Sequence, residues 1–101
     1  MPKTLTGVGC IICASHMSVD KKVMHGHTWE VTAWFRKLKN AACLQKELEV
    51  VCERYNHTLL PAEIAWGEAL AAEILMRLKV WDCVEVHVSR PLERIYAKAI
   101  A

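Results

Sequence analysis

The stretch that decides the fold of this chain is His25-Gly26-His27-Thr28-Trp29-Glu30-Val31-Thr32-Ala33-Trp34-Phe35. Side chains of two kinds alternate along it, and a period of two predicts a β-strand over residues 25–35. The face expected to be mainly buried carries His25, His27, Trp29, Val31, Ala33 and Phe35. We therefore expect a strand that packs one face on the core and presents two histidines at its start.

The histidines at the start of this strand indicate a metal site. Side chains two apart in a strand share a face, and the small Gly26 between them is expected to leave room for both imidazoles to turn toward one ion. His16, in Ala14-Ser15-His16, supplies a third imidazole if its strand is a neighbour. Three neutral imidazoles with an open fourth position are the usual ligands of catalytic zinc, whereas structural zinc is closed by four protein ligands. The pattern predicts Zn²⁺ held by His16, His25 and His27; the alternative is that these are only polar residues near strand ends.

The elements around this strand begin with a second strand and two helices. A run of small and β-branched residues predicts a strand over residues 4–15, and the polar stretch 18–22 is expected to be a loop. Apolar residues at spacings of three and four predict two amphipathic helices. The first is expected to be capped by Asn40 and to end near Asn56, and the second to begin near Gly67.

The C-terminal part of the chain returns to strand patterns. Alternation predicts strands over residues 83–88 and 95–97, joined by a turn that contains Pro91. The resulting order is strand, strand, helix, helix, strand, strand. It predicts an α+β fold: a ββααββ antiparallel four-stranded sheet with two helices packed on one face. Such a sheet leaves its other face and its edges exposed, so self-association into a homo-oligomer is expected.

Composition narrows the class of protein. With 101 residues we expect a single domain over residues 1–101. Hydrophobic residues make up 53% of the chain, yet no apolar run approaches the ~20 residues that cross a bilayer, so no membrane partner is expected. A net charge of +2 without a basic run argues against nucleic acid. Five cysteines, an odd number, are expected to be free thiols in core positions and to indicate a cytoplasmic location.

Two histidine segments resemble those of the 6-pyruvoyl-tetrahydropterin synthases and the related 6-carboxy-tetrahydropterin synthases of queuosine biosynthesis. Ile12-Cys13-Ala14-Ser15-His16 is similar to the family's aromatic-x-Ala-Ala/Ser-His segment, and His25-Gly26-His27-Thr28-Trp29-Glu30-Val31 to its His-Gly-His-aromatic strand. Weaker similarities lie in Tyr55-Asn56-His57-Thr58-Leu59-Leu60, Glu68-Ala69-Leu70-Ala71 and Val86-His87-Val88. Their order and rough spacing hold over nearly the whole chain, which is shorter than usual for the family.

The resemblance implies a fold, a cofactor and a reaction. It implies the tunnelling fold, in which subunits join edge to edge into a trimeric barrel and two trimers stack. It also implies that His16, His25 and His27 hold zinc, which orients hydroxyl groups of dihydroneopterin triphosphate. In the family a cysteine thiolate removes a side-chain proton and an Asp-His pair assists proton movement. These roles fit a Lewis acid that lowers the pKa of bound oxygens and a base close to its proton.

The sequence departs from the family pattern at these catalytic positions. Lys21 stands where the family has its cysteine, and Asn56 stands where it has the aspartate of the Asp-His pair, which leaves His57 alone. Ser89 aligns with the glutamate that anchors the pterin ring, and Glu93 is the candidate to replace it. An amide next to His57 can hydrogen-bond an imidazole but cannot stabilise an imidazolium by charge.

Two classes of function follow from these departures. The first is a zinc-dependent lyase acting on dihydroneopterin triphosphate or a related pterin-like small molecule, with His57 or Asp20 as the base. Asp20 is alternatively a fourth metal ligand or a solvated turn residue. The second class is a non-catalytic zinc-binding relative that serves ligand binding or assembly.

Overall fold

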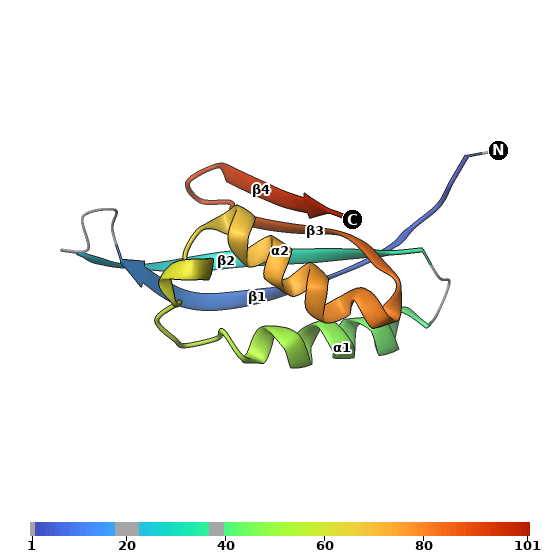
Figure 1. Cartoon of the computed structure of the whole chain (residues 1–101), viewed down its shortest axis with the longest axis horizontal. Helices are drawn as coiled ribbons and strands as arrows, with labels where there is room; N and C mark the ends of the chain where they lie inside the picture. The colour runs from blue at the N-terminus through green and yellow to red at the C-terminus, as the bar shows by residue number, and fades with distance from the viewer. Residues whose placement is uncertain (1, 18–22, 37–39) are drawn as a thin grey trace.

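The computed structural model of the chain describes residues 2–17, 23–36 and 40–101. One four-stranded antiparallel sheet has the strand order β1-β2-β3-β4. Its strands are β1 (Thr6–Met17), β2 (Met24–Phe35), β3 (Cys83–Arg90) and β4 (Ile95–Ile100). Between β2 and β3 the chain forms α1 (Ala41–Glu53), η1 (Ala62–Ile64), α2 (Gly67–Leu78) and η2 (Lys79–Trp81). This is the ββααββ order expected from the sequence, and both helices lie on the same side of the sheet (Figure 1).

The alternation in β2 produces the expected buried face. Val31, Ala33 and Phe35 are fully buried and Trp29 nearly so, whereas Thr28 and Glu30, on either side of Trp29, are exposed. These side chains pack under the helices with residues of β1 and β3 that follow the same alternation. The core members from those two strands are Val8, Ile12, Ala14, Val86 and Val88.

The helices cover this face through their apolar stripes. The N-cap of α1 is Asn40, as expected, and its side chain accepts a hydrogen bond from the backbone N–H of Ala42. Leu44 and Leu48 of α1 are buried over β1, and α2 packs over β3 and β4 with Leu70 and Ile74 in the core. The second helix begins at Gly67, the residue expected from the sequence.

Two expectations about cysteines are wrong. All five cysteines are free thiols, and Cys52 and Cys83 are buried, but Cys13 and Cys43 are exposed. In β1 the even-numbered residues face the helices, so Cys13 necessarily points to the uncovered face of the sheet. Cys43 lies just before the buried Leu44 of α1, on a side of the helix turned away from the core. Among the described residues, no helix is long and apolar enough to cross a membrane.

Candidate metal centre

The three histidines of the sequence motif lie at one end of the sheet, where β1 ends and β2 begins (Figure 1). In the antiparallel register His16 is opposite His25, and Ala14 is opposite His27. Directly opposed residues of an antiparallel pair point to the same face, as do residues two apart in one strand. All three imidazoles therefore belong to the face that the helices cover. The requirement that the strand of His16 be a neighbour of β2 is met.

The three rings are close together. The ring centroids of His16 and His27 are 4.8 Å apart, and that of His25 is 6.0 Å from His16 and 6.1 Å from His27. Imidazoles held by one tetrahedral zinc ion through nitrogens at about 2.0–2.1 Å would have centroids roughly 5 Å apart. His16 is 3% exposed, whereas His25 is exposed to solvent. His25 is thus the outlying ring, and it is the one with room to rotate.

As the side chains stand, no group of three or more histidine, cysteine or carboxylate side chains within residues 2–17, 23–36 and 40–101 is arranged to hold a metal ion. Two of the three predicted ligands converge, because Nε2 of His16 lies 2.9 Å from Nε2 of His27. Rotation of the exposed His25 side chain is the change that a three-histidine site would require.

The other ring nitrogens of the two converging histidines are tied to acceptors. Nδ1 of His16 donates to the backbone carbonyl of Ala65 at 2.8 Å, and Nδ1 of His27 donates to Oε1 of Glu93 at 3.2 Å. A carbonyl and a carboxylate can only accept, so each Nδ1 must carry the proton. When neutral, both imidazoles therefore present an unprotonated Nε2, which is the tautomer that a metal ligand needs.

A cation already contacts one of these two unprotonated nitrogens. Nη1 of Arg90, at the end of β3, lies 2.8 Å from Nε2 of His27, and a guanidinium can only donate. The pKa of His27 lies below its usual range, first because of burial and then because of the Arg90 charge, while Glu93 opposes both. His27 is therefore held in the neutral form that binds metals.

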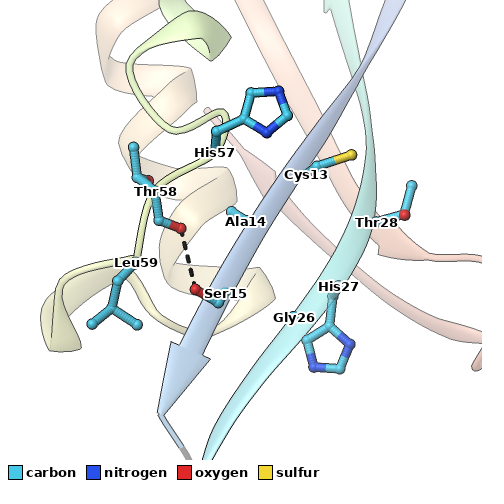
Figure 2. Close-up of a pocket in the computed structure, with 9 residues that line it drawn as sticks. All are labelled: Cys13, Ala14, Ser15, Gly26, His27, Thr28, His57, Thr58 and Leu59. Carbon is cyan, nitrogen blue, oxygen red and sulfur yellow. Dashed lines mark hydrogen bonds between the residues drawn. The ribbon is translucent and has the colours of Figure 1, made fainter.

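His57 and His27 line the same pocket of about 460 Å³, which runs over β1, β2 and the segment after α1 (Figure 2). The other lining residues include Cys13, Thr28 and Thr58. His57 is exposed and has a positive φ of 58°, and its backbone N–H donates to the carbonyl oxygen of Cys13 at 2.6 Å. Cys13 and Thr28 face the uncovered side of the sheet, whereas the His27 imidazole belongs to the covered side. The shared lining therefore does not bring the His57 and His27 rings to one face.

The remaining predicted site residues are placed differently. Ser89 lies on the uncovered face of the sheet, in a separate pocket of about 500 Å³ that Thr32 and His87 also line. It is therefore not next to the three predicted metal ligands. The side chain of Asn56 accepts a hydrogen bond from the backbone N–H of Cys13 at 2.9 Å. Asp20 and Lys21 lie outside the described residues.

The sequence matches no protein-family model and no curated protein. The fold does match solved structures, among them the structure of Caenorhabditis elegans 6-pyruvoyl tetrahydropterin synthase. The TM-score is 0.81 at 14% sequence identity, over 100% of this chain and 97% of that chain. The chain has the tunnelling fold of 6-pyruvoyl tetrahydropterin synthase. This confirms the fold class expected from the sequence, and at 14% identity it establishes the fold alone.

At two residues this tetrahydropterin synthase-like fold differs from the expectations drawn from the sequence. Arg90 was not among the predicted site residues, although Val86 and Val88 are buried and the same alternation carries Arg90 to the histidine side of the sheet. The reasoning about Gly26 was wrong. A Cβ at Gly26 would have no neighbour within 4 Å, because that residue points away from the face of His25 and His27.

Proposed function

We propose that the chain holds a zinc ion through His16, His25 and His27. We further propose that it acts as a carbon–oxygen lyase of the tetrahydropterin synthase type, on dihydroneopterin triphosphate or a related pterin. The observation that carries the proposal is the arrangement of the two converging histidines. Each gives its Nδ1–H to a fixed acceptor, and their Nε2 atoms lie 2.9 Å apart.

This arrangement fits a cation beside the two Nε2 atoms, and Nη1 of Arg90 now lies 2.8 Å from Nε2 of His27. If both imidazoles are neutral, two lone pairs face each other at 2.9 Å and repel, unless a positive charge lies beside them. Histidine ligands of zinc commonly donate their other ring N–H to a carboxylate or a backbone carbonyl, which orients the ring. Here the carboxylate of Glu93 accepts from Nδ1 of His27, and the backbone carbonyl of Ala65 accepts from Nδ1 of His16. Zinc, when bound, would supply a Lewis acid that lowers the pKa of ligand oxygens.

The chain's own residues would bind the substrate and move its proton. The pocket of about 460 Å³ is within the range of small-molecule sites. In the lyase proposal His57 takes the proton, because it is the histidine of this pocket that does not belong to the predicted ligand set. The contact with His27 favours an orienting role for Glu93, and its role in substrate binding stays a prediction, as do those of Ser89 and Asp20.

One observation favours a second candidate function, a zinc-binding relative that binds a ligand without turnover. The Asn56 side chain is occupied by the backbone N–H of Cys13, at 2.9 Å, and so does not orient His57 as an aspartate partner would. His57 would then be a weaker proton acceptor in the pocket. Under either function we propose a homo-oligomer, a trimer or a hexamer, in the cytoplasm.

The first experiment measures metal content and absolute mass. Untagged wild type, His27→Ala and His87→Ala would be compared by elemental analysis and native mass spectrometry. His87→Ala is a matched control, because His87 lies on the uncovered face and pairs with Glu85. We expect about one zinc per subunit in wild type and His87→Ala and a loss of zinc in His27→Ala. Wild type without tightly bound zinc after reconstitution would contradict the proposal.

The second experiment separates the two functions. Zinc-loaded wild type and His57→Asn would be assayed with dihydroneopterin triphosphate. Asparagine tolerates the positive φ of 58° at this position, so the variant removes the imidazole without straining the backbone. Turnover by wild type that falls at least about a hundredfold in His57→Asn supports the lyase, since general-base catalysis contributes about 10²–10⁴-fold. Stoichiometric pterin binding without turnover supports the non-catalytic relative.

A further inference from the structure

Arg90 is held against the histidine cluster by two independent contacts. Its guanidinium carbon lies 5.4 Å from the ring centroid of Trp29, which is 2% exposed. Its Nη1 donates to Nε2 of His27 at 2.8 Å. An arginine side chain is flexible when free, and its guanidinium is weakly hydrated, so stacking on a buried indole combined with a directed hydrogen bond fixes its position.

Arg90 and a metal ion compete for the same lone pair. Nε2 of His27 has one lone pair, because its Nδ1 carries the proton given to Glu93. A metal that binds this nitrogen must displace Nη1 of Arg90. The stacking on Trp29 and the attachment to the end of β3 do not depend on that hydrogen bond, so the released guanidinium stays beside the centre.

With a divalent metal bound and the guanidinium still beside it, the centre has a net positive charge. A divalent metal and Arg90 contribute three positive charges, the imidazoles contribute none when neutral, and Glu93 contributes one negative charge through its contact with His27. The N–H groups of a guanidinium form a fork that matches the spacing of carboxylate and phosphate oxygens. Both the charge and the freed donors therefore favour an anion.

We propose that Arg90 makes this centre selective for ligands that carry an anionic oxygen group, a carboxylate or a phosphate. The inference rests on the proposed metal site and goes beyond it, because it assigns the selectivity to a residue outside the predicted ligand set. Arg90 is a specificity-determining residue. In the metal-free protein its guanidinium donates to Nε2 of His27. In the metal-loaded protein it binds the anionic group of the ligand.

The test uses Co²⁺-loaded protein, whose visible absorption responds to binding beside the metal. Wild type, Arg90→Gln and Arg94→Gln would be titrated at constant ionic strength with acetate, inorganic phosphate and the neutral probe acetamide. Arg94→Gln is the matched control, because it removes the same charge from an exposed side chain four residues away. Acetate and phosphate distinguish the two sources of the anionic group.

We expect Arg90→Gln to weaken acetate or phosphate binding by about tenfold or more, with Arg94→Gln like wild type and acetamide binding unaffected. Arg90→Gln is also expected to bind Co²⁺ at least as tightly as wild type, since the competitor for His27 is gone. Arg90→Lys, which keeps the charge but not the fork, is expected to fall between them.

Two results would overturn the inference in different ways. Equal anion affinity for Co²⁺-loaded wild type, Arg90→Gln and Arg90→Lys would overturn the role of Arg90 and leave the metal site standing. Failure of wild type to take up Co²⁺ or Zn²⁺ would overturn the metal site itself, and with it this inference.

Discussion

Gly7 lies under the indole ring of its partner across β1 and β2, Trp34. A Cβ on Gly7 would be 2.6 Å from two ring carbons of Trp34, a distance that real contacts do not reach. We expect Gly7→Ala to lower the free energy of unfolding by about 1–3 kcal/mol, because the indole must move off the sheet. Chemical denaturation of the metal-free protein measures the loss.

Gly26→Ala is the control for this substitution. It makes the same chemical change in the neighbouring strand of the hairpin, where an added Cβ has no neighbour within 4 Å. Its stability is expected to match wild type to within about 0.5 kcal/mol. Equal losses in the two variants would show that the close approach of Trp34 to Gly7 does not determine the stability of this pair.

Glu85 and His87 form a hydrogen-bonded pair on the uncovered face of β3, in which Nε2 of His87 donates to Oε2 of Glu85. This hydrogen bond is the main reason that the pKa of Glu85 lies below its usual range, and the charge of Lys98 lowers it further. We expect His87→Gln to raise the pKa of Glu85 toward its usual value. Carbon-detected NMR titration of the Glu85 carboxyl group measures this, and Lys98→Gln is expected to give a smaller rise.

The sign of the accompanying stability change follows from the lowered pKa. Because the folded state keeps Glu85 ionised to lower pH than the unfolded state does, the pair stabilises the fold above the unfolded pKa. This contribution is lost as the pH falls through the folded pKa. The pair is partly exposed, so the effect is small, and His87→Gln should reduce the acid sensitivity of unfolding. An unchanged Glu85 pKa in His87→Gln would contradict this account.

Among the elements, the segment after α1 pairs with the C-terminal part of the β1 edge, at Cys13 and Ser15. Thr58 accepts a hydrogen bond from the backbone N–H of Ser15, and the backbone N–H of Leu60 donates to the Ser15 carbonyl. Ser15 and Leu59 also form a parallel bridge. Together with the Asn56 contact to the N–H of Cys13, these bonds satisfy backbone groups that an open edge would leave unpaired.

We expect Asn56→Ala to cost about 1 kcal/mol of stability, because the N–H of Cys13 loses its acceptor. Asn56→Asp keeps an acceptor oxygen and is expected to retain most of this stability. Hydrogen exchange at Cys13 supplies a local measurement alongside thermal unfolding. Protection of this amide that is the same in wild type and Asn56→Ala would show that the side chain does not hold the segment on β1.

At the scale of the whole molecule, β4 forms the other edge of the sheet. The backbone N–H of Ala101 donates to the Val84 carbonyl, so alternate residues of β4 bond to β3 and those between them point outward. Tyr96, Lys98 and Ile100 are the outward set. Unpaired donors on an edge with exposed Ile95, Tyr96 and Ile100 favour strand pairing with another subunit.

Lys98→Pro is expected to remove one of these outward donors without disturbing the bonds to β3. If the proposed trimer or hexamer forms by pairing of β4 with the β1 edge of the next subunit, the wild type should have a mass that is a multiple of three subunits, and Lys98→Pro should be smaller. Lys98→Ala, which removes the charge and keeps the donor, is expected to behave as wild type. Analytical ultracentrifugation measures all three, and an unchanged assembly in Lys98→Pro would exclude this edge as the interface.

The parts of this molecule that could be predicted from sequence are those with a local period. The alternation in β2 predicted its buried face, and Asn40 predicted the start of α1, because both patterns span only a few residues. The pairing of His27 with Glu93 and Arg90 joins residues more than sixty positions apart and depends on sheet register, which no local pattern supplies. The placement of Ser89 on the face away from the histidine cluster follows instead from local alternation, because its neighbour Val88 is buried and successive residues of a strand point to opposite faces.

The burial of His16 has an optical consequence. Its ring centroid lies 5.7 Å from that of Trp29 and 5.1 Å from that of Trp66, edge to face in both cases. Indole emission responds to charge and to neighbouring rings at such distances. Whatever binds His16, a proton, a metal ion or a ligand, therefore changes the electric field on two of the four tryptophans. The native fluorescence of the unmodified chain reports on occupancy of its own candidate centre, without a label or a chemical probe.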